Sequence, residues 1–479
     1  MKDKLLLSVL LFSTILFGCS INNETSSNLE VLYKLEEPTI SYSEVLDSTH
    51  SNYYGNYEHL KSVGDQKILV IPVDFVDYPS SLLEGGEEYS LKRIEDTFFG
   101  KSEDTAWESV SSYYQKSSYG KLNLEGKVSP WFHTNKTIDE VKKTKEEPTW
   151  SILREAVKWY KSNFDDICDF DVDLDGYIDA VWLVYSAPFS LTGDDLLWAY
   201  TYWDYEAESD FLSPNANIYS WASYYFTYEG NYDLTDSHTF IHETGHLFGL
   251  VDYYTYDVRD WGPTGLLDMM DGNIGDHNGY SKGILGWTYP YVATGKCQVT
   301  LRPFESSGDY LIIPASFNGS MFDEYLLLEY YTPTGLNYFD SLKIYPNSSR
   351  MFTTNGVKVY HVDARLGVVK YNMQGGWKFS SYTDKILSTT NSYTQIAASN
   401  TMSTSLDNNK LIHLLESSGN NTLRYGRSAS ATNAMLFKQG DSFGKKTFNG
   451  FKFNEGKFGF TFDIVSMNEE NVIITVNKK

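Results

Sequence analysis

Cysteine is scarce in this sequence, with three residues among 479. This number excludes a disulfide-stabilised scaffold and a zinc site built from four thiolates. Positive charge is also in deficit, because 39 Lys and Arg stand against 63 Asp and Glu, a formal net charge of −24. A chain of that sign repels phosphate backbones, so we expect no nucleic-acid partner. With 41% hydrophobic residues and no low-complexity bias, the chain is expected to fold into two or three structural units.

The first 18 residues have the pattern of a signal peptide. Two lysines precede the apolar residues 5–17, a stretch too short to span a bilayer. The sequence Leu-Phe-Gly-Cys, which ends at Cys19, resembles the bacterial lipobox and predicts a lipid-modified N-terminus on the extracellular face of a bacterial membrane. The alternative is an ordinary secretory signal. Cys168 and Cys297 then remain as thiols that either pair outside the cytoplasm or lie buried as small apolar side chains.

Composition and periodicity divide the remaining chain into three parts. Residues 19–65 are polar and are expected to form a tether with a short pro-segment. Residues 66–295 alternate between strand and helix patterns, which indicates an α/β (α+β) layer. Here we expect strands at 67–74, 177–185 and, near an edge, 216–226, with helices at 104–118 and 149–163. Residues 296–479 predict a β-rich, sandwich-like domain with strands at 299–303, 310–314, 324–331, 357–362, 458–464 and 472–476.

A His-Glu-x-x-His-x-x-Gly-x-x-Asp sequence begins at His242. On a helix, His242 and His246 leave the same face one turn apart, where two imidazoles can hold one Zn²⁺. Glu243 follows the first ligand and stands where a base can take a proton from water. Gly249 lets the chain leave the helix, so that Asp252 can return as a third ligand. Three protein ligands leave the fourth coordination position of a zinc ion open for water, which is typical of a catalytic zinc site.

This motif resembles the metzincin zinc signature in the variant with Asp as third ligand, and more particularly the immune inhibitor A-type family of secreted bacterial metallopeptidases. Further segments similar to that family lie at residues 118–124, 171–179, 267–272, 282–287, 325–329 and 359–363. The resemblance covers residues 66–365 and implies a zincin-like catalytic domain. It also implies that Met270, rather than Met269, is the Met-turn residue beneath the metal. The family typically carries a longer pro-region than residues 20–65.

Motif and resemblance together predict an extracellular zinc endopeptidase that acts on proteins or peptides. Zn²⁺ makes hydroxide available at neutral pH, and Glu243 accepts the proton and passes it to the leaving amine. His277 and Tyr280 either donate a hydrogen bond to the developing oxyanion or serve in packing. His238 is expected to face solvent or to support a ligand rather than to bind the metal.

An acidic loop precedes the strand expected at 177–185. Its residues match the first, third, fifth, sixth, seventh and ninth positions of an EF-hand loop: Asp171, Asp173, Asp175, Gly176, Tyr177 and Asp179. Trp182 stands where the bidentate Glu would be, so the loop is not an EF-hand. The four Asp carboxylates and the Tyr177 carbonyl can bind Ca²⁺, and the alternative is an Asx-rich turn without an ion.

Two other functions compete with the endopeptidase. One is a zincin-like surface lipoprotein that binds or adheres through its β-rich half, and the other is a zinc hydrolase of glycopeptides or small peptides. The intact Glu243 favours an enzyme, because a binding protein has no need of a carboxylate there. Two aromatic segments, residues 198–203 and 223–228, either line a cleft or pack in the core. We expect a monomer, attached to the membrane through Cys19.

Overall fold

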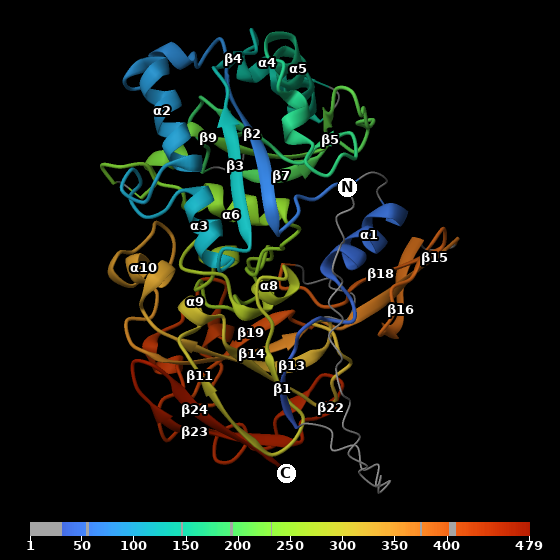
Figure 1. The fold of residues 1–479 in the computed structure, drawn as a ribbon, viewed down its shortest axis with the longest axis vertical. Helices are drawn as coiled ribbons and strands as arrows, with labels where there is room; N and C mark the ends of the chain where they lie inside the picture. The colour runs from blue at the N-terminus through green and yellow to red at the C-terminus, as the bar shows by residue number, and fades with distance from the viewer. Residues whose placement is uncertain are drawn as a thin grey trace, which may run out of the picture. The chain divides into compact units, whose positions relative to one another are not determined.

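The computed structural model describes residues 31–53, 57–144, 147–191, 195–230, 232–373, 376–401 and 409–479. The signal peptide and Cys19 lie outside these residues. Residues 31–479 form one compact unit in which helices and several sheets are combined (Figure 1), so the expected α+β class is confirmed. Within the described residues no helix is both long and apolar enough to cross a bilayer.

A mixed sheet forms the upper part of the unit in Figure 1. Its strands in spatial order are β3 (Leu122–Val128), β2 (Gly64–Asp74), β6 (Val181–Tyr185), β9 (Ile218–Ser223) and β7 (Tyr200–Trp203), with β4 (Phe132–His133) also paired to β2. All pairs are parallel except that of β7, the edge strand, with β9. Alternate residues of β2 enter different cores, Ile68 on one face and Leu69 on the other. Both faces are therefore buried, as the apolar run at 67–74 predicts.

Helices cover both faces of this sheet. The helices of the described chain are α1 (Tyr42–Tyr53), α2 (Gly86–Phe99), α3 (Val110–Ser117), α4 (Ile138–Lys142), α5 (Pro148–Asn163), α6 (His238–Leu247), α7 (Met269–Gly272), α8 (Gly279–Ile284), α9 (Phe304–Ser307) and α10 (Tyr338–Leu342). Of these, α2, α3, α5 and α6 pack on this sheet. Helix α5 packs Ile152 and Leu153 into the same core as Leu69. Helices α3 and α6 pack Val110 and Ile241 with Ile68 on the opposite face. The His-Glu-x-x-His motif thus lies on a helix fixed against the central sheet.

Three predicted elements of this part differ from the structure. The helix expected at 104–118 begins only at Val110, because Ser109 caps it by accepting a hydrogen bond from the Ser112 amide. The strand expected at 177–185 is divided into β5 (Tyr177–Ile178), paired with β8 (Asn215–Ala216), and β6. The strand at 216–226 is not at an edge, because β9 lies between β6 and β7.

The lower part of the unit contains two larger sheets that face each other. One has the order β1 (Leu32–Lys34), β10 (Tyr291–Ala293), β12 (Tyr310–Pro314), β13 (Glu324–Tyr331), β14 (Gly356–Asp363) and β19 (Ile412–Leu415). The other has the order β11 (Cys297–Leu301), β24 (Val472–Lys478), β23 (Phe460–Met467) and β20 (Ser442–Phe443). Leu326 of the first sheet and Phe462 and Ile474 of the second share one apolar core. This arrangement is the expected sandwich.

Two smaller sheets complete the lower part. The first has the order β16 (Gly376–Thr383), β15 (Leu366–Asn372), β18 (Ser392–Ile396) and β17 (Ser388–Thr389), and it lies beside α1. The second is the hairpin of β21 (Lys452–Phe453) and β22 (Gly456–Lys457). Part of the polar stretch at 388–408 is therefore folded, whereas residues 402–408 lie outside the described part of the chain.

The tether expected at 19–65 is wrong for the described residues from 31 onward. Strand β1 pairs with β10 in the lower sheet, and the Leu60 amide donates to the Leu247 carbonyl at 2.9 Å. Tyr42 and Val45 of α1 are buried. A few apolar side chains in a polar segment are enough to dock it, because their partners are supplied by distant parts of the chain. The boundary expected at 295/296 also separates strands β10 and β12 of one sheet.

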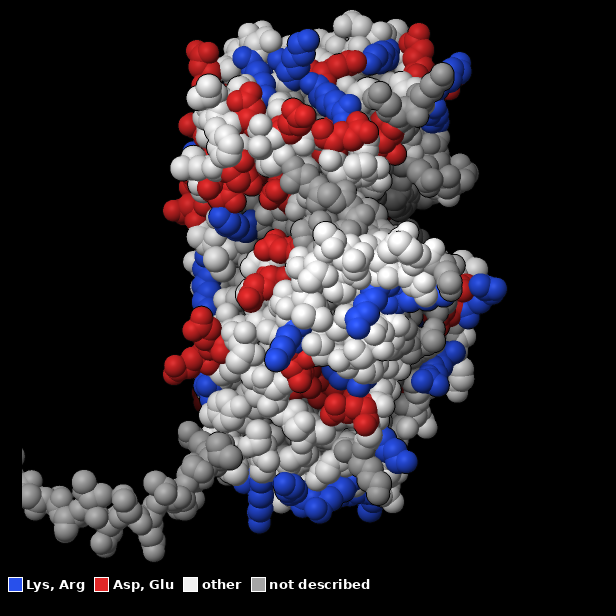
Figure 2. Space-filling model, turned by 90° about the vertical axis from the view of Figure 1, so that its right-hand side faces the viewer, with Lys and Arg blue, Asp and Glu red and all other residues white. Residues whose placement is uncertain are grey.

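Charge is unevenly distributed on the face shown in Figure 2. Most acidic side chains of this face lie on its upper part, with basic side chains among them, and a row of Lys and Arg lies along its lower end. The net charge of −24 is therefore not spread evenly over this face, and ligands of different charge meet different surroundings at its two ends.

Candidate metal centre

Helix α6 presents both histidines of the motif on one face. The ring centroids of His242 and His246 are 4.9 Å apart. After the helix, Gly249 has a φ of +85°, a left-handed conformation that favours glycine and turns the chain back. Asp252 then lies so that its Oδ1 is 3.0 Å from His242 Nε2 and 3.3 Å from His246 Nε2. The structure thus brings the three predicted zinc ligands together, as the spacing predicts.

Backbone carbonyls fix the orientation of both imidazoles. His242 Nδ1 lies 2.7 Å from the Met269 carbonyl oxygen, and His246 Nδ1 lies 2.7 Å from the Leu250 carbonyl oxygen. A carbonyl can only accept, so each Nδ1 carries its ring's proton and donates it. Each Nε2 is then left with a lone pair directed toward Asp252. Such anchoring of the far ring nitrogen is typical of histidines that bind metals.

Asp252 Oδ1 is a buried acceptor that no donor satisfies within the described structure. The two Nε2 atoms beside it carry no proton in this tautomer, and the Tyr256 hydroxyl donates to the other oxygen, Oδ2. A buried carboxylate oxygen without a donor is costly. A divalent cation between the oxygen and the two lone pairs removes that cost, and two imidazoles with one carboxylate are a zinc donor set. The residues therefore fit the metal.

The electrostatics of the site keep Asp252 anionic and make Glu243 easier to protonate than an exposed carboxylate. Burial acts against the charge of Asp252, but His246 and His242 in their protonated forms, which stand where a bound cation would, outweigh it and lower the pKa of its carboxyl. Burial raises the pKa of the Glu243 carboxyl, and His246 and His242 offset part of this rise. A base with a raised pKa holds a proton more readily, which is the property needed for proton transfer near neutral pH.

Met270 packs directly under the metal-binding helix. A Cβ atom added to Gly245, which lies between the two histidines, would be 2.6 Å from Met270 Sδ. Met270 is fully buried, and the carbonyl of its neighbour Met269 is the one that orients His242. The short helix α7 therefore supports the site twice, once by packing and once by a hydrogen bond. This position agrees with a floor beneath the metal rather than a ligand.

Two cavities meet at Glu243. Their volumes are about 640 and 890 Å³, and both are lined by Glu243, Trp198, Ala199 and Tyr254. Thr201 Oγ1, on the edge strand β7, donates to the Glu243 carbonyl at 2.9 Å. The smaller cavity is bounded by α1 and β18, and the larger by residues 345–348 and 425–429. Together they form a cleft on both sides of the site, lined in part by the aromatic segments expected at 198–203 and 223–228.

Of the two roles left open for His277 and Tyr280, the structure favours packing over donation into the cleft. Each is 1% exposed, and neither lines the cavities at Glu243. His277 packs against Tyr113, Tyr114 and Trp287 instead. Their place in the sequence after Met270 suggested proximity, but helix α8 is buried between the two halves of the unit.

His238 does not face solvent and does not join the metal ligands. It is 1% exposed, with Nδ1 2.7 Å from Asp236 and Nε2 3.3 Å from Asp340. Burial acts to lower the pKa of His238, but Asp236 and Asp340 prevail and raise it to about 10. This histidine is therefore a buried cation that ties the start of α6 to α10.

Two tyrosines of the site were missed from the sequence. Tyr254 lines both cavities beside Glu243, and its ring centroid is 6.3 Å from that of His242. Tyr256 donates to Asp252 Oδ2. The signal available was their position just after the third ligand, in a loop that has to turn back toward the helix. Helix α1, expected to be part of a tether, was missed as a wall of the cleft because its partners are distant in the sequence.

The acidic loop gathers three of its four predicted aspartates. Asp171, Asp173 and Asp179 each offer a carboxylate oxygen, and these atoms lie within 4.8 Å of one another. Asp175 is not in that group, because its Oδ1 accepts from the Tyr177 amide at 2.8 Å. Asp171 accepts the amides of Asp175 and Gly176, and the bond of Asp175 to the amide two residues on is that of an Asx turn. The loop is therefore a turn capped by its own side chains in which three carboxylate oxygens lie close together.

Glu58 is a further carboxylate at this loop, and sequence reasoning did not find it. Burial raises the pKa of Glu58 to about 7, and Asp175 and Asp173 contribute to this rise. Burial together with Asp173 and Asp171 raises the pKa of Asp179 to about 7 as well. Lys61 Nζ, 3.1 Å from Asp173, brings a positive charge to the group. Such crowding of carboxylates favours a bound cation.

The two cysteines of the described residues are free. Cys168 is exposed and Cys297 is partly buried, so they neither form a disulfide nor both lie buried. No family model and no curated protein match the chain. The resemblance to immune inhibitor A-type peptidases therefore rests on the sequence motifs alone.

Proposed function

We propose that this chain is a zinc-dependent endopeptidase. The observation that carries the proposal is the geometry at Asp252, whose buried Oδ1 lacks a donor and lies 3.0 and 3.3 Å from two histidine nitrogens. A binding protein needs no such site in a cleft with a buried carboxylate beside it. The extended cleft, which continues on both sides of Glu243, suits a polypeptide better than a small molecule.

The residues of the chain have separate tasks in the proposed reaction. Zn²⁺, when bound by His242, His246 and Asp252, supplies a Lewis acid that polarises the peptide carbonyl and acidifies water. Glu243 takes a proton from the attacking water and delivers it to the leaving amine. Thr201 holds the backbone of Glu243, and Tyr254 stands beside it in both cavities, close enough to contact a substrate.

Two further parts of the proposal concern other regions of the chain. We propose that the acidic loop binds Ca²⁺ through Asp171, Asp173 and Asp179, with Glu58 nearby. We also propose that Cys19 is lipidated and that the enzyme acts on the extracellular face of a bacterial membrane. The support for this second part is the sequence of residues 1–19 alone.

A hydrolysis assay tests the proposed function. We expect the full-length mature protein, supplied with zinc, to cleave casein, gelatin or a quenched peptide library, and a zinc chelator to stop cleavage. Glu243→Gln should lower the rate by about 10²- to 10⁴-fold, because a positioned base contributes that much. The matched control is Glu470→Gln, which removes an exposed carboxylate far along the chain and should leave the rate unchanged.

The assay has outcomes that refute the proposal. Cleavage that survives Glu243→Gln would exclude Glu243 as the base, and cleavage that survives chelation would exclude the metal. A protein that binds zinc and hydrolyses none of these substrates would favour the surface-binding lipoprotein. Activity limited to glycopeptides or small peptides would favour the narrower zinc hydrolase.

A further inference from the structure

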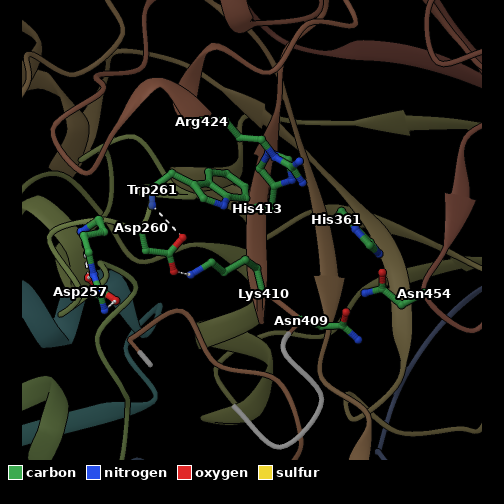
Figure 3. A pocket seen from close by; sticks show the side chains of 10 residues that line it. Asp257, Asp260, Trp261, His361, Asn409, Lys410, His413, Arg424 and Asn454 are labelled. Carbon is green, nitrogen blue, oxygen red and sulfur yellow. Dashed lines mark hydrogen bonds and ion pairs between the residues drawn. The ribbon is translucent and has the colours of Figure 1, made fainter. Parts of the chain in front are cut away.

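A third cavity, of about 620 Å³, lies outside the metal cleft (Figure 3). It is bounded by residues 257–261, which follow the metal-binding loop, by β14 and β19, and by residue 424. Of its ten described lining residues only Trp261 is apolar, and none is aliphatic. A cavity of this composition has no place for the aliphatic side chains of a peptide, but it suits a ligand rich in hydroxyl groups.

The Trp261 indole is the flat apolar surface of this cavity. The His413 ring meets it edge-on, with ring centroids 4.7 Å apart. The guanidinium carbon of Arg424 lies over the indole at 5.2 Å from its centroid, Lys410 Nζ lies over it at 5.9 Å, and Figure 3 shows Arg424 and His413 beside the ring. An aromatic face bordered by polar groups matches a sugar ring, which has apolar C–H faces and polar edges.

Arg424 is the cation of the cavity that is available to a ligand. The two other cations are already paired, Lys410 with Asp260 at 2.6 Å and Arg259 with Asp257 at 2.8 Å. Arg424 is exposed and has no carboxylate partner among the residues that the structure describes. A single guanidinium can bind a carboxylate through two parallel hydrogen bonds. A phosphate group usually recruits more cations than one.

The remaining polar groups of the cavity are held in place. Asn454 Nδ2 donates to Asp363 at 2.8 Å, and His361 Nε2 lies 2.7 Å from Glu324. Burial lowers the pKa of His413 to about 3, and His361 and Arg424 contribute to this fall. His413 is therefore neutral and can both donate and accept a hydrogen bond, as a hydroxyl group does. Groups fixed in this way lose little freedom on binding.

We propose that this cavity binds a sugar that carries a carboxylate. The sugar ring lies on Trp261, its carboxylate pairs with Arg424, and its hydroxyl groups bond to His413 and Asn454. This cavity adjoins the cleft at Glu243. Arg424 lines the cavity, and the next residue, Tyr425, lines the larger part of the cleft. It is therefore placed to hold a glycan attached to a substrate. Binding of the sugar itself does not depend on the proposed peptidase activity.

Calorimetric titration of the full-length mature protein tests this proposal. The probes are the methyl glycosides of glucuronic acid and of N-acetylneuraminic acid, methyl glucoside, acetate and inorganic phosphate. Methyl glucoside is the matched neutral sugar, because it differs from the glucuronide only in carrying a hydroxymethyl group in place of the carboxylate. We expect at least one acidic sugar to bind about tenfold or more tightly than the glucoside, acetate and phosphate, since a charge-assisted bond is worth about that much.

Variants identify the site of binding. Arg424→Gln should weaken binding of the acidic sugar about tenfold and leave it no better than the glucoside. Trp261→Ala should abolish binding of both sugars, and Trp261→Phe should restore part of it. Arg350→Gln, which removes an exposed arginine elsewhere, should bind as the wild type does. Glu243→Gln should also bind normally, which separates this proposal from the peptidase.

Three results would overturn the proposal. The first is that neither acidic sugar binds, and the second is that phosphate or the glucoside binds as tightly as the acidic sugars. The third is an Arg424→Gln variant that has the melting temperature of the wild type and binds the acidic sugar equally well. Because Arg424 is exposed, its substitution is not expected to disturb folding.

Discussion

Tyr256 supports the metal centre through the oxygen of Asp252 that the histidines do not approach. Its hydroxyl fixes the rotation of the carboxylate and so directs Oδ1 toward the two Nε2 atoms. Partners of this kind raise metal affinity about 10- to 100-fold. We expect Tyr256→Phe to weaken zinc binding by that factor, measured by competition with a chromogenic chelator.

The control for this measurement is Tyr338→Phe, which removes the hydroxyl of a tyrosine that is 56% exposed. It should bind zinc as the wild type does. Equal zinc affinity of Tyr256→Phe and wild type would show that the loop alone positions Asp252 and that the Tyr256 hydroxyl has no part in it.

His238 makes the stability of the fold depend on pH in the alkaline range. Its pKa in the folded chain is about 10, above the ordinary value of 6.5, because Asp236 and Asp340 flank it. The folded state therefore binds the proton more tightly than the unfolded state. The resulting stabilisation is complete below about pH 6.5 and is lost as the pH rises through 10. Urea unfolding between pH 7 and 10 should show this fall.

Substitution of His238 distinguishes this linkage from other alkaline effects. Tyr345 stacks on the ring and donates to Glu229, and burial raises the pKa of its hydroxyl well above 10, so it does not titrate between pH 7 and 10. His238→Ala should destabilise the fold by about 3–5 kcal/mol at pH 7, because two buried carboxylates lose their partner. Its stability should vary less with pH than that of the wild type. If the free energy of unfolding of His238→Ala depended on pH as strongly as that of the wild type, His238 would be neutral in the folded chain.

At the scale of residues, the sequence predicts what depends on local spacing. His242, His246 and Asp252 converge because one helical turn and one glycine turn are enough to bring them together. The carbonyl oxygens that orient the two histidines, and the Tyr256 hydroxyl that bonds to Asp252, depend on the path of a loop. The spacing of residues in the sequence does not determine that path. The role of His277 stayed open for the same reason, since its distance along the chain from Met270 does not determine on which side of α8 the cleft lies.

Among the elements, the acidic loop before β5 gives the clearest prediction. Calcium should raise the melting temperature of the protein, because it neutralises carboxylates that repel one another in the folded state. Asp173→Asn should abolish most of this increase, as seen by calorimetry with and without millimolar calcium. Zinc content should not change in this variant.

Asp169→Asn is the matched control, since Asp169 is an exposed aspartate just outside the loop. It should retain the full effect of calcium. If calcium had no effect on the wild type, the loop would be the self-capped turn alone, which its backbone hydrogen bonds also permit.

Elements with an unbroken apolar or helical pattern were predictable almost to the residue. The strands expected at 310–314 and 324–331 coincide with β12 and β13, and the helix at 149–163 with α5. Elements whose ends depend on a cap or on a distant partner were not. Ser109 decides where α3 begins, and β1 exists because β10 offers it an edge. Propensity within β1 itself is too weak to reveal either its partner or its presence.

In the molecule as a whole, one core connects the two expected domains. Ile68 of the upper sheet, Tyr280 of α8 and Leu327 of the lower sheet belong to the same buried cluster. We therefore expect one cooperative unfolding transition, with tryptophan fluorescence and far-ultraviolet circular dichroism coinciding in urea. Residues 66–295 expressed alone should not unfold cooperatively. Two separate unfolding transitions in the intact chain would instead show that it consists of two domains, as the boundary predicted at 295/296 requires.

The proposed enzyme depends on one zinc ion held by His242, His246 and Asp252. X-ray absorption at the zinc edge of the purified full-length protein, with metal analysis of the same sample, shows both the ion and its ligands. We expect one zinc per chain, bound by two imidazole nitrogens and by oxygen at about 2.0–2.2 Å, with no sulfur ligand. His246→Ala should lose the metal. A folded wild-type protein without bound zinc, or one whose zinc has thiolate ligands or persists in His246→Ala, would contradict this assignment.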